Sequence, residues 1–75
     1  MSIVPILRPW DVVKIFEKFG WEVVRQRGSH IVPTKKGHIA SLSVPNHNEV
    51  ARGTLRSLIA KAGITVKEFL NSIDD

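Results

Sequence analysis

The chain has no cysteine among its 75 residues. Without thiols, neither disulfides nor thiolate metal sites can hold the fold together, which excludes small disulfide-rich secreted domains and zinc ribbons. No run approaches the roughly 18 apolar residues that span a membrane. The N-terminal stretch is broken by Pro5 and has no basic leader, so it does not have the pattern of a signal peptide. These absences favour a protein of a reducing, cytoplasmic compartment.

Acidic residues are also few in the middle of the chain. Eleven Lys and Arg against seven Asp and Glu give a net charge of +4. Between Lys18 and Lys61 there are eight cations and only two anions, Glu22 and Glu49. A basic centre of this kind indicates a polyanionic partner. Solubility alone is the alternative explanation of the charge.

The length allows one small domain, residues 1–75, with a single core. A chain of this size buries about 60 % of the surface that its unfolded form exposes. Apolar residues make up 43 % of the chain and charged residues 24 %, a globular balance. Residues 1–8 and 73–75 are expected to be flexible ends.

The first periodic segment predicts a helix over residues 9–19. Its apolar residues recur at the spacing of one helix face: Val12, Ile15, Phe16 and Phe19. Pro9 suits the first helical position, and Gly20 suits the left-handed residue that follows a helix end.

Two further helices are predicted near the C-terminus. The second helix has its apolar face at Leu55, Leu58, Ile59 and Ala62. Gly63 is a suitable stop for it, whereas Asn48 and Thr54 could each cap its start. Thr65 and Glu68 then match the Thr-x-x-Glu capping box, which predicts a short last helix to about Ser72.

Three β-forming runs lie between the first two helices, at about residues 21–26, 29–34 and 38–44, with glycine-containing links between them. In the third run we expect Ala40, Leu42 and Val44 to face the core. Ser41 and Ser43 should face the open side. Pro33 lacks an amide donor, so we expect it near a strand end or a bulge.

The predicted order is α-β-β-β-α with a short extra C-terminal helix, an α+β fold. A three-stranded antiparallel meander must cover its apolar face, and the helices from both ends of the chain can cover it together. The other face of the sheet then stays open.

The sequence has no phosphate-binding glycine loop of the Walker or Rossmann type. Its three histidines lie on different predicted elements and without metal-ligand spacing, so neither a metal site nor another cofactor is expected.

The stretch RQRGSHIVPTKKG, residues 25–37, concentrates four cations around His30. Cleavage of RNA at its 2′-OH needs no metal: a base removes the hydroxyl proton, a cation stabilises the phosphoryl oxygens and an acid protonates the leaving oxygen. Imidazole suits the proton transfers, since its unperturbed pKa is about 6.5. The alternative is that His30 is a plain surface or interface residue. His38 fits an edge position, and His47 could cap a helix, contact phosphate or only shape its loop.

Several stretches together resemble the HicA (YcfA-like) family of mRNA interferase toxins. The resemblance covers most of the chain and rests on Gly20-Trp21, Arg25-Gln26-Arg27-Gly28-Ser29-His30, Val44-Pro45-Asn46-His47, Gly53-Thr54-Leu55-Arg56, Ala62-Gly63-Ile64 and Glu68-Phe69-Leu70. It implies a double-stranded-RNA-binding-domain-like fold and ribosome-independent endonucleolytic cleavage of mRNA, and the 2′-OH chemistry described above makes metal-independent cleavage the expectation. It also implies His30 as the catalytic residue and a HicB-like antitoxin that masks the active site.

The expected site combines these two lines of reasoning. Arg25, Arg27, Lys35 and Lys36 are expected to bind RNA phosphates, and Gly28 to form the turn. Ser29 could donate to phosphate or only shape the turn, and His47 could take part in catalysis or be structural. Two other functions remain open: a non-catalytic RNA-binding module on the same fold, and a protein-interaction domain that uses Trp10 and Trp21.

Overall fold

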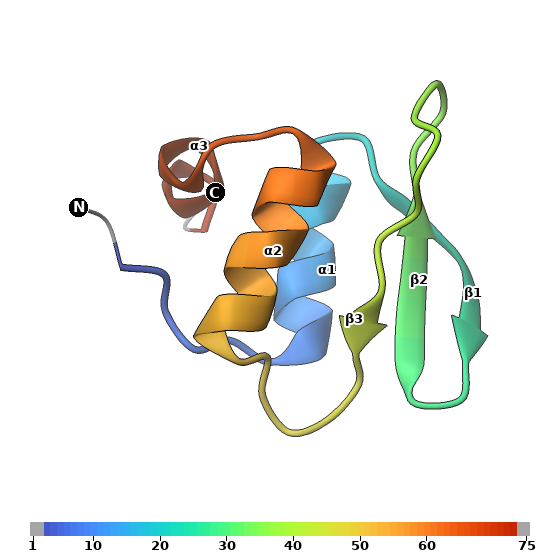
Figure 1. Ribbon diagram of the computed structural model, residues 1–75, viewed down its shortest axis with the longest axis horizontal. Helices are drawn as coiled ribbons and strands as arrows, with labels where there is room; N and C mark the ends of the chain where they lie inside the picture. Colours follow the sequence, from blue (N-terminus) through green and yellow to red (C-terminus); the bar gives the residue numbers. More distant parts are fainter. Residues whose placement is uncertain (1–2, 74–75) are drawn as a thin grey trace.

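The computed structural model describes residues 3–73 and shows an α+β domain (Figure 1). In chain order its elements are α1 (Pro9–Glu17), β1 (Glu22–Arg27), β2 (His30–Thr34), β3 (Val44–Pro45), α2 (Arg52–Ala62) and α3 (Val66–Asn71). The three strands form one antiparallel sheet in the order β1-β2-β3. The predicted double-stranded-RNA-binding-domain-like layout, α-β-β-β-α with one further helix, is confirmed.

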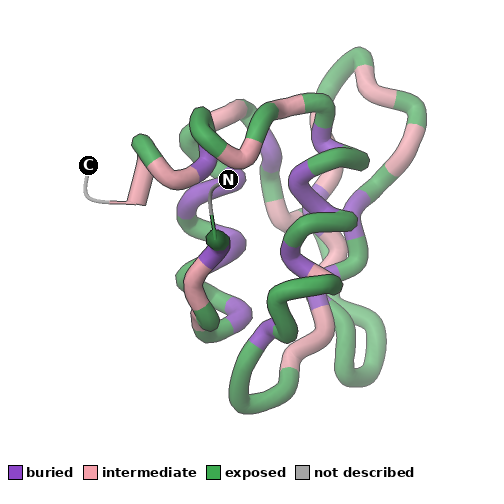
Figure 2. Tube along the Cα trace, turned by 60° about the vertical axis from the view of Figure 1, so that its left-hand side comes forward, coloured by how far each residue is buried: buried purple, intermediate pink, exposed green. Residues whose placement is uncertain are grey.

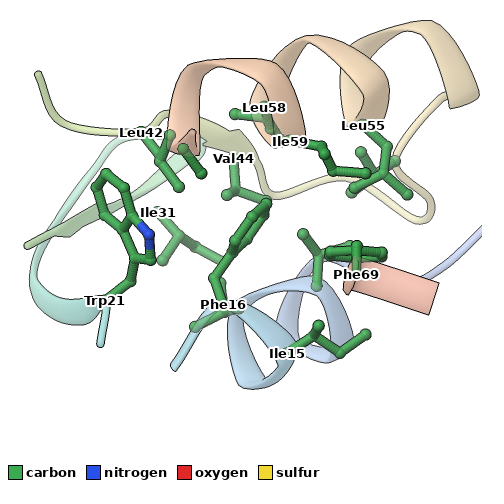
Figure 3. Close-up of a cluster of buried hydrophobic side chains, with 14 of the residues drawn as sticks. Ile15, Phe16, Trp21, Ile31, Leu42, Val44, Leu55, Leu58, Ile59 and Phe69 are labelled. Atoms are coloured by element: carbon green, nitrogen blue, oxygen red, sulfur yellow. The ribbon is translucent and has the colours of Figure 1, made fainter. Parts of the chain in front are cut away.

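The helices lie on one side of the sheet. α1 and α2 run side by side next to it, and α3 lies beyond them, on the side away from the strands (Figure 1). Phe16 of α1 is fully buried between the sheet residues Ile31 and Val44 and the α3 residue Phe69 (Figure 3). The two phenyl rings pack with their centroids 5.3 Å apart. Truncating a buried phenylalanine to alanine typically costs about 3–5 kcal/mol, so this contact holds α3 to the domain.

α1 ends two residues earlier than predicted. Its last helical residue is Glu17, and Lys18 to Gly20 form a turn with φ of +94° at Gly20. The backbone N–H of Trp21 then donates to the Phe16 carbonyl at 3.3 Å. Gly20 is therefore the residue that reverses the chain into β1, as its sequence position indicated.

β1 and β2 form a hairpin with the two-residue loop Gly28-Ser29. Positive φ occurs only at the first loop residue, Gly28 (φ +53°), the pattern of a type II′ turn. The register pairs Val23 with Pro33 and leaves Val24 unpaired as a bulge. The bulge explains why this run does not alternate cleanly in the sequence, and Pro33 lies opposite it, as expected.

The third strand is much shorter than predicted. Only Val44–Pro45 pair with β2, and residues 38–43 are irregular, whereas a strand was expected over residues 38–44. Pro33 has no N–H to extend the ladder, and one backbone bond remains there, from Leu42 N to the Pro33 carbonyl at 3.0 Å. The predicted facing of Leu42 and Val44 is nevertheless correct, since both are fully buried.

The segment 38–43 is shaped by side-chain contacts instead. His38 packs against the buried ring of Trp21, with ring centroids 4.9 Å apart. Its Nδ1 also lies 3.1 Å from the Ala40 carbonyl. His38 therefore has a structural position, and it contributes nothing to the open face of the sheet.

α2 and α3 follow the predicted periodicity, but α2 starts differently. Its N-cap is Ala51, with no side-chain cap, so neither Asn48 nor Thr54 caps it. Gly63 ends it with φ of +79°. The capping box of α3 is confirmed: Glu68 N donates to Thr65 Oγ1 at 3.0 Å, and Thr65 N donates to Glu68 Oε1 at 2.8 Å.

The N-terminal segment lies along the body of the domain. Within the expected flexible end 1–8, Val4 is fully buried and the Arg52 Nε donates to its carbonyl at 2.9 Å. Leu7 forms an antiparallel bridge with Val50. At the other end Ile73 packs on the core. The expectation for residues 1, 2, 74 and 75 lies outside the described residues.

Candidate functional site

The alternation of β2 assigns His30 to the face of the sheet that the helices leave open. Ile31 and Pro33 are buried, whereas His30 is exposed and Val32 is half-buried. Successive side chains of a strand point to opposite faces, so His30 and Val32 lie on the face away from α1 and α2. β1 is exposed along nearly its whole length, and the hairpin stands out as a largely solvent-facing segment (Figure 2).

A shallow hollow of about 460 Å³ lies on this open face. It is lined by Arg25, Arg27, His30, Val32, Thr34, Ser41, Leu42 and Ser43. Three of the predicted site residues therefore share one surface. Ser41 and Ser43 were expected to face the open side, and their place in this lining agrees with that expectation.

The hairpin register places an arginine directly beside His30. Arg27 is the cross-strand partner of His30, and Arg25 is paired with Val32. Directly opposed residues have Cβ atoms about 5 Å apart, and diagonal ones about 7–8 Å apart. Two guanidinium groups and one imidazole can therefore meet the same phosphate group.

The described part of the chain offers no bonding partner to these three side chains. Within residues 3–73, no hydrogen bond or ion pair occupies the side chain of Arg25, Arg27 or His30. All three are exposed. Guanidinium donors in this state suit bidentate recognition of a phosphate or carboxylate, because their fork geometry matches two oxygens.

The turn before His30 is tied to the loop after β3. The Asn46 N–H donates to the Ser29 carbonyl at 2.6 Å, and Pro45 pairs with His30. The backbone of Ser29 therefore has a structural partner, while its side chain is exposed at the hairpin tip. Gly28 supplies the positive φ that this tight turn requires.

His47 lies in a different hollow from His30. A larger depression of about 800 Å³ contains His47 and also Arg8, Trp10 and Glu49. It adjoins the hairpin tip through Asn46, but His47 does not line the hollow of His30. The sequence left open whether His47 takes part in catalysis with His30, and the structure has the two residues line separate hollows.

Lys35 and Lys36 lie at the opposite end of β2 from His30. Strand residues rise about 3.3 Å each, so five residues separate Lys35 from His30 by about 16 Å. The loop that follows β2 points away from the hairpin tip (Figure 1). A Cβ atom on Gly20 would lie 3.3 Å from Cε of Lys35, so this lysine packs near the end of α1.

Sequence reasoning missed two parts of this surface. Val32 and Thr34 join the lining, and the alternation of β2 was the signal that could have assigned them. Arg8 and Trp10 lie beside His47, a proximity that depends on how the N-terminal segment crosses the domain.

No group of three or more His, Cys, Asp or Glu residues among 3–73 is placed to hold a metal ion. No helix in that range has both the length and the apolar character needed to cross a membrane.

The fold and this surface define a small α+β domain with a basic, open sheet face. The sequence profile of the family described as HicA toxin of bacterial toxin-antitoxin matches residues 10–64. The chain therefore belongs to the HicA toxin family. Its role is that of the toxin in a toxin–antitoxin system, in which its partner is the antitoxin. No curated protein matches the sequence.

Proposed function

We propose that this toxin is a metal-independent, ribosome-independent endoribonuclease that cleaves mRNA in the cytoplasm, with His30 as a general acid or base. The observation that carries the proposal is the hollow on the open sheet face, where His30 lies across the hairpin from Arg27 and diagonal to Arg25. Membership of the HicA toxin family supports it.

The proposed reaction is an internal transfer at phosphorus. The 2′-oxygen of the ribose forms a bond to phosphorus, and the bond to the 5′-oxygen of the next nucleotide breaks. The products are a 2′,3′-cyclic phosphate and a free 5′-hydroxyl, so no water is consumed in this step. One proton leaves the 2′-OH and one proton reaches the 5′-oxygen. His30 carries one of these two transfers.

The arginines stabilise the charge that develops on the phosphoryl oxygens. Arg27 and Arg25 are exposed and have no hydrogen-bond or ion-pair partners within residues 3–73, so their donors need not leave another group when RNA binds. Each guanidinium group can turn two N–H donors toward the oxygens that gain negative charge and stabilise them electrostatically. Ser29, at the tip of the turn, is in reach to donate to a neighbouring phosphate oxygen.

His47 is assigned to the neighbouring hollow rather than to the reacting phosphate, because it does not line the hollow of His30. Lys35 and Lys36 would contact phosphates farther along a bound RNA. A HicB-like antitoxin that covers the open sheet face would block His30 and both arginines together.

The decisive test is cleavage of a single-stranded RNA by the purified chain in EDTA. We expect cutting by the unmodified chain and a 10²- to 10⁴-fold lower rate for His30→Ala, the range for loss of a general acid or base. His47→Ala is the matched histidine control and should lose much less. An RNA with a single 2′-deoxy substitution at the cut site should stay intact.

Equal cutting by His30→Ala would disprove the catalytic role of His30. Intact RNA with all variants would disprove cleavage itself. If that RNA still bound with a strong salt dependence, the chain would be a non-catalytic RNA-binding module instead.

A further inference from the structure

The hollow that contains His47 has its own composition and adjoins the hollow of His30. One wall comes from the loop after β3 and the other from the start of α1. Its volume is about 800 Å³. The hairpin tip, this loop and the N-terminal end of α1 all lie at the same end of the molecule (Figure 1).

Trp10 is the distinctive residue of this hollow. It is 46 % exposed although it lies in α1, whereas Trp21 is 2 % exposed. The core face of α1 is filled by other residues, among them Val12, Val13 and Phe16, so α1 packs without the indole of Trp10. A half-exposed indole beside polar groups is suited to stacking on a flat partner.

The charges around Trp10 distinguish between kinds of flat partner. Asp11 and Glu49 line the hollow with Arg8 as the only Lys or Arg in its lining. With His47 neutral the lining is net negative, which disfavours a second phosphate. A nucleobase fits better, because it has an uncharged π-face and edge N–H groups that carboxylates can accept from.

The two hollows are joined by short backbone links. Pro45 lies opposite His30 in the sheet, and the next residue, Asn46, donates its N–H to Ser29 and lines the hollow of Trp10. A single strand of RNA with a phosphate at His30 therefore has a short path along the hairpin tip to the indole.

We infer that this hollow is a nucleobase subsite, in which Trp10 stacks on one unpaired base of the RNA whose phosphate lies at His30. The inference rests on the proposed function in that the ligand is RNA. It adds a contact to a base on a surface that otherwise recognises only phosphates. It also requires the RNA to be single-stranded at that position, because a paired base cannot turn out to meet the indole.

The test measures whether removing one base of the RNA weakens binding only when Trp10 is present, which is the coupling between Trp10 and that base. The full chain carrying His30→Ala, which keeps RNA intact, is titrated with a fluorescent single-stranded RNA and with copies that have one abasic position each. Trp10→Ala should weaken binding of the intact RNA by about tenfold, within the range for loss of a base–aromatic stack. Trp10→Phe, which keeps a ring, should lose less than threefold.

One abasic position should weaken binding to the chain with Trp10 by a similar factor and should not weaken Trp10→Ala further. The slope of log affinity against log salt should be the same for Trp10→Ala as for the parent, because no phosphate contact is lost. Arg27→Gln should reduce that slope and keep the abasic effect.

Three results would overturn the inference: a Trp10→Ala effect below twofold, additive effects of Trp10→Ala and every abasic position, or no RNA binding. The measurements with abasic RNAs and unmodified Trp10 do not depend on whether Trp10→Ala folds. If no abasic position weakens binding to that chain, the inference is also overturned. The proposed catalysis fails or succeeds separately. If Trp10 couples to one base but the chain with unmodified His30 does not cut RNA, only the catalytic role of His30 is disproved. If that chain cuts RNA but Trp10 couples to no base, only the nucleobase subsite is disproved.

Discussion

The position of His30 depends on single residues at the hairpin tip. His30 directly follows a two-residue loop, and Gly28 adopts φ of +53° in that loop. An L-residue is disfavoured there because its Cβ crowds the backbone, by about 1–2 kcal/mol in the left-handed region. The rest of the structure adds no obstacle, since a Cβ on Gly28 would meet no atom within 4 Å apart from those of its own chain neighbours. The constraint is therefore one of backbone conformation alone.

Gly28→Ala should lower the free energy of unfolding by about 1 kcal/mol. In a domain of this length that corresponds to about 4–8 °C in Tm, measurable by circular dichroism. A synthetic chain with D-alanine at position 28 is the matched control and should keep the original Tm, because D-residues favour positive φ.

Gly53→Ala should instead raise Tm slightly, since Gly53 is in α2, has no positive φ and has free space around it. An unchanged Tm for L-alanine at position 28 would show that the turn differs from the one described.

At the scale of secondary-structure elements, one hairpin supplies the cations and the histidine of the candidate site, and the helices support it from the buried side of the sheet. β1 and β2 supply Arg25, Arg27 and His30, while the buried side of β2 packs on the helices. α3 is the most distant element, and it is held by Phe69 and by its capping box. Changes in α3 should therefore alter stability without altering the chemistry of the open face.

Thr65→Ala removes the cap of α3 and should lower the free energy of unfolding by about 1 kcal/mol. Guanidinium titration measures this change. Thr65→Ser keeps the hydroxyl that accepts from Glu68 N and should stay close to the original stability. RNA binding should be the same for both variants, and a loss of stability equal in Ala and Ser would show that the cap is not the cause.

At the scale of the whole molecule, the excess of positive charge is distributed over two ends of the sheet. Arg25 and Arg27 lie on the open face near the hairpin tip, whereas Lys35 lies at the other end of β2, about 16 Å from His30, and Lys36 follows it. A short RNA centred on His30 meets the arginines first. In the proposed RNA complex, the net charge of +4 would therefore act mainly as attraction at long range, and the arginines would supply the local contacts.

For a short single-stranded RNA, Arg25→Gln and Arg27→Gln should each reduce the slope of log affinity against log salt by about 0.7, the value for one phosphate contact. Lys36→Gln should leave the slope for the short RNA unchanged. Lys67→Gln on α3 is the control for net charge alone, because it removes one charge far from the open face. Equal effects of all four variants, measured by anisotropy at several salt concentrations, would contradict a local site.

The sequence by itself determined the kinds of element and their order, and it supplied the candidate site residues as a prediction. Local rules suffice for these: apolar residues at helical spacing predict α1 and α2, and Thr65 and Glu68 predict the start of α3. The glycine at position 28 predicts a turn before His30, whereas the pairing of Arg27 with His30 was seen only in the structure. Such patterns depend on neighbours within a few positions of the chain, and the chain carries that information directly.

Tertiary structure decided the rest. The third strand is limited to Val44–Pro45, because its length depends on Pro33 in another strand and on the packing of His38 against Trp21. The separation of His47 from His30 and the exposure of Trp10 likewise follow from how distant segments cross at one end of the domain. These features depend on contacts between residues far apart in the chain, which no local pattern encodes.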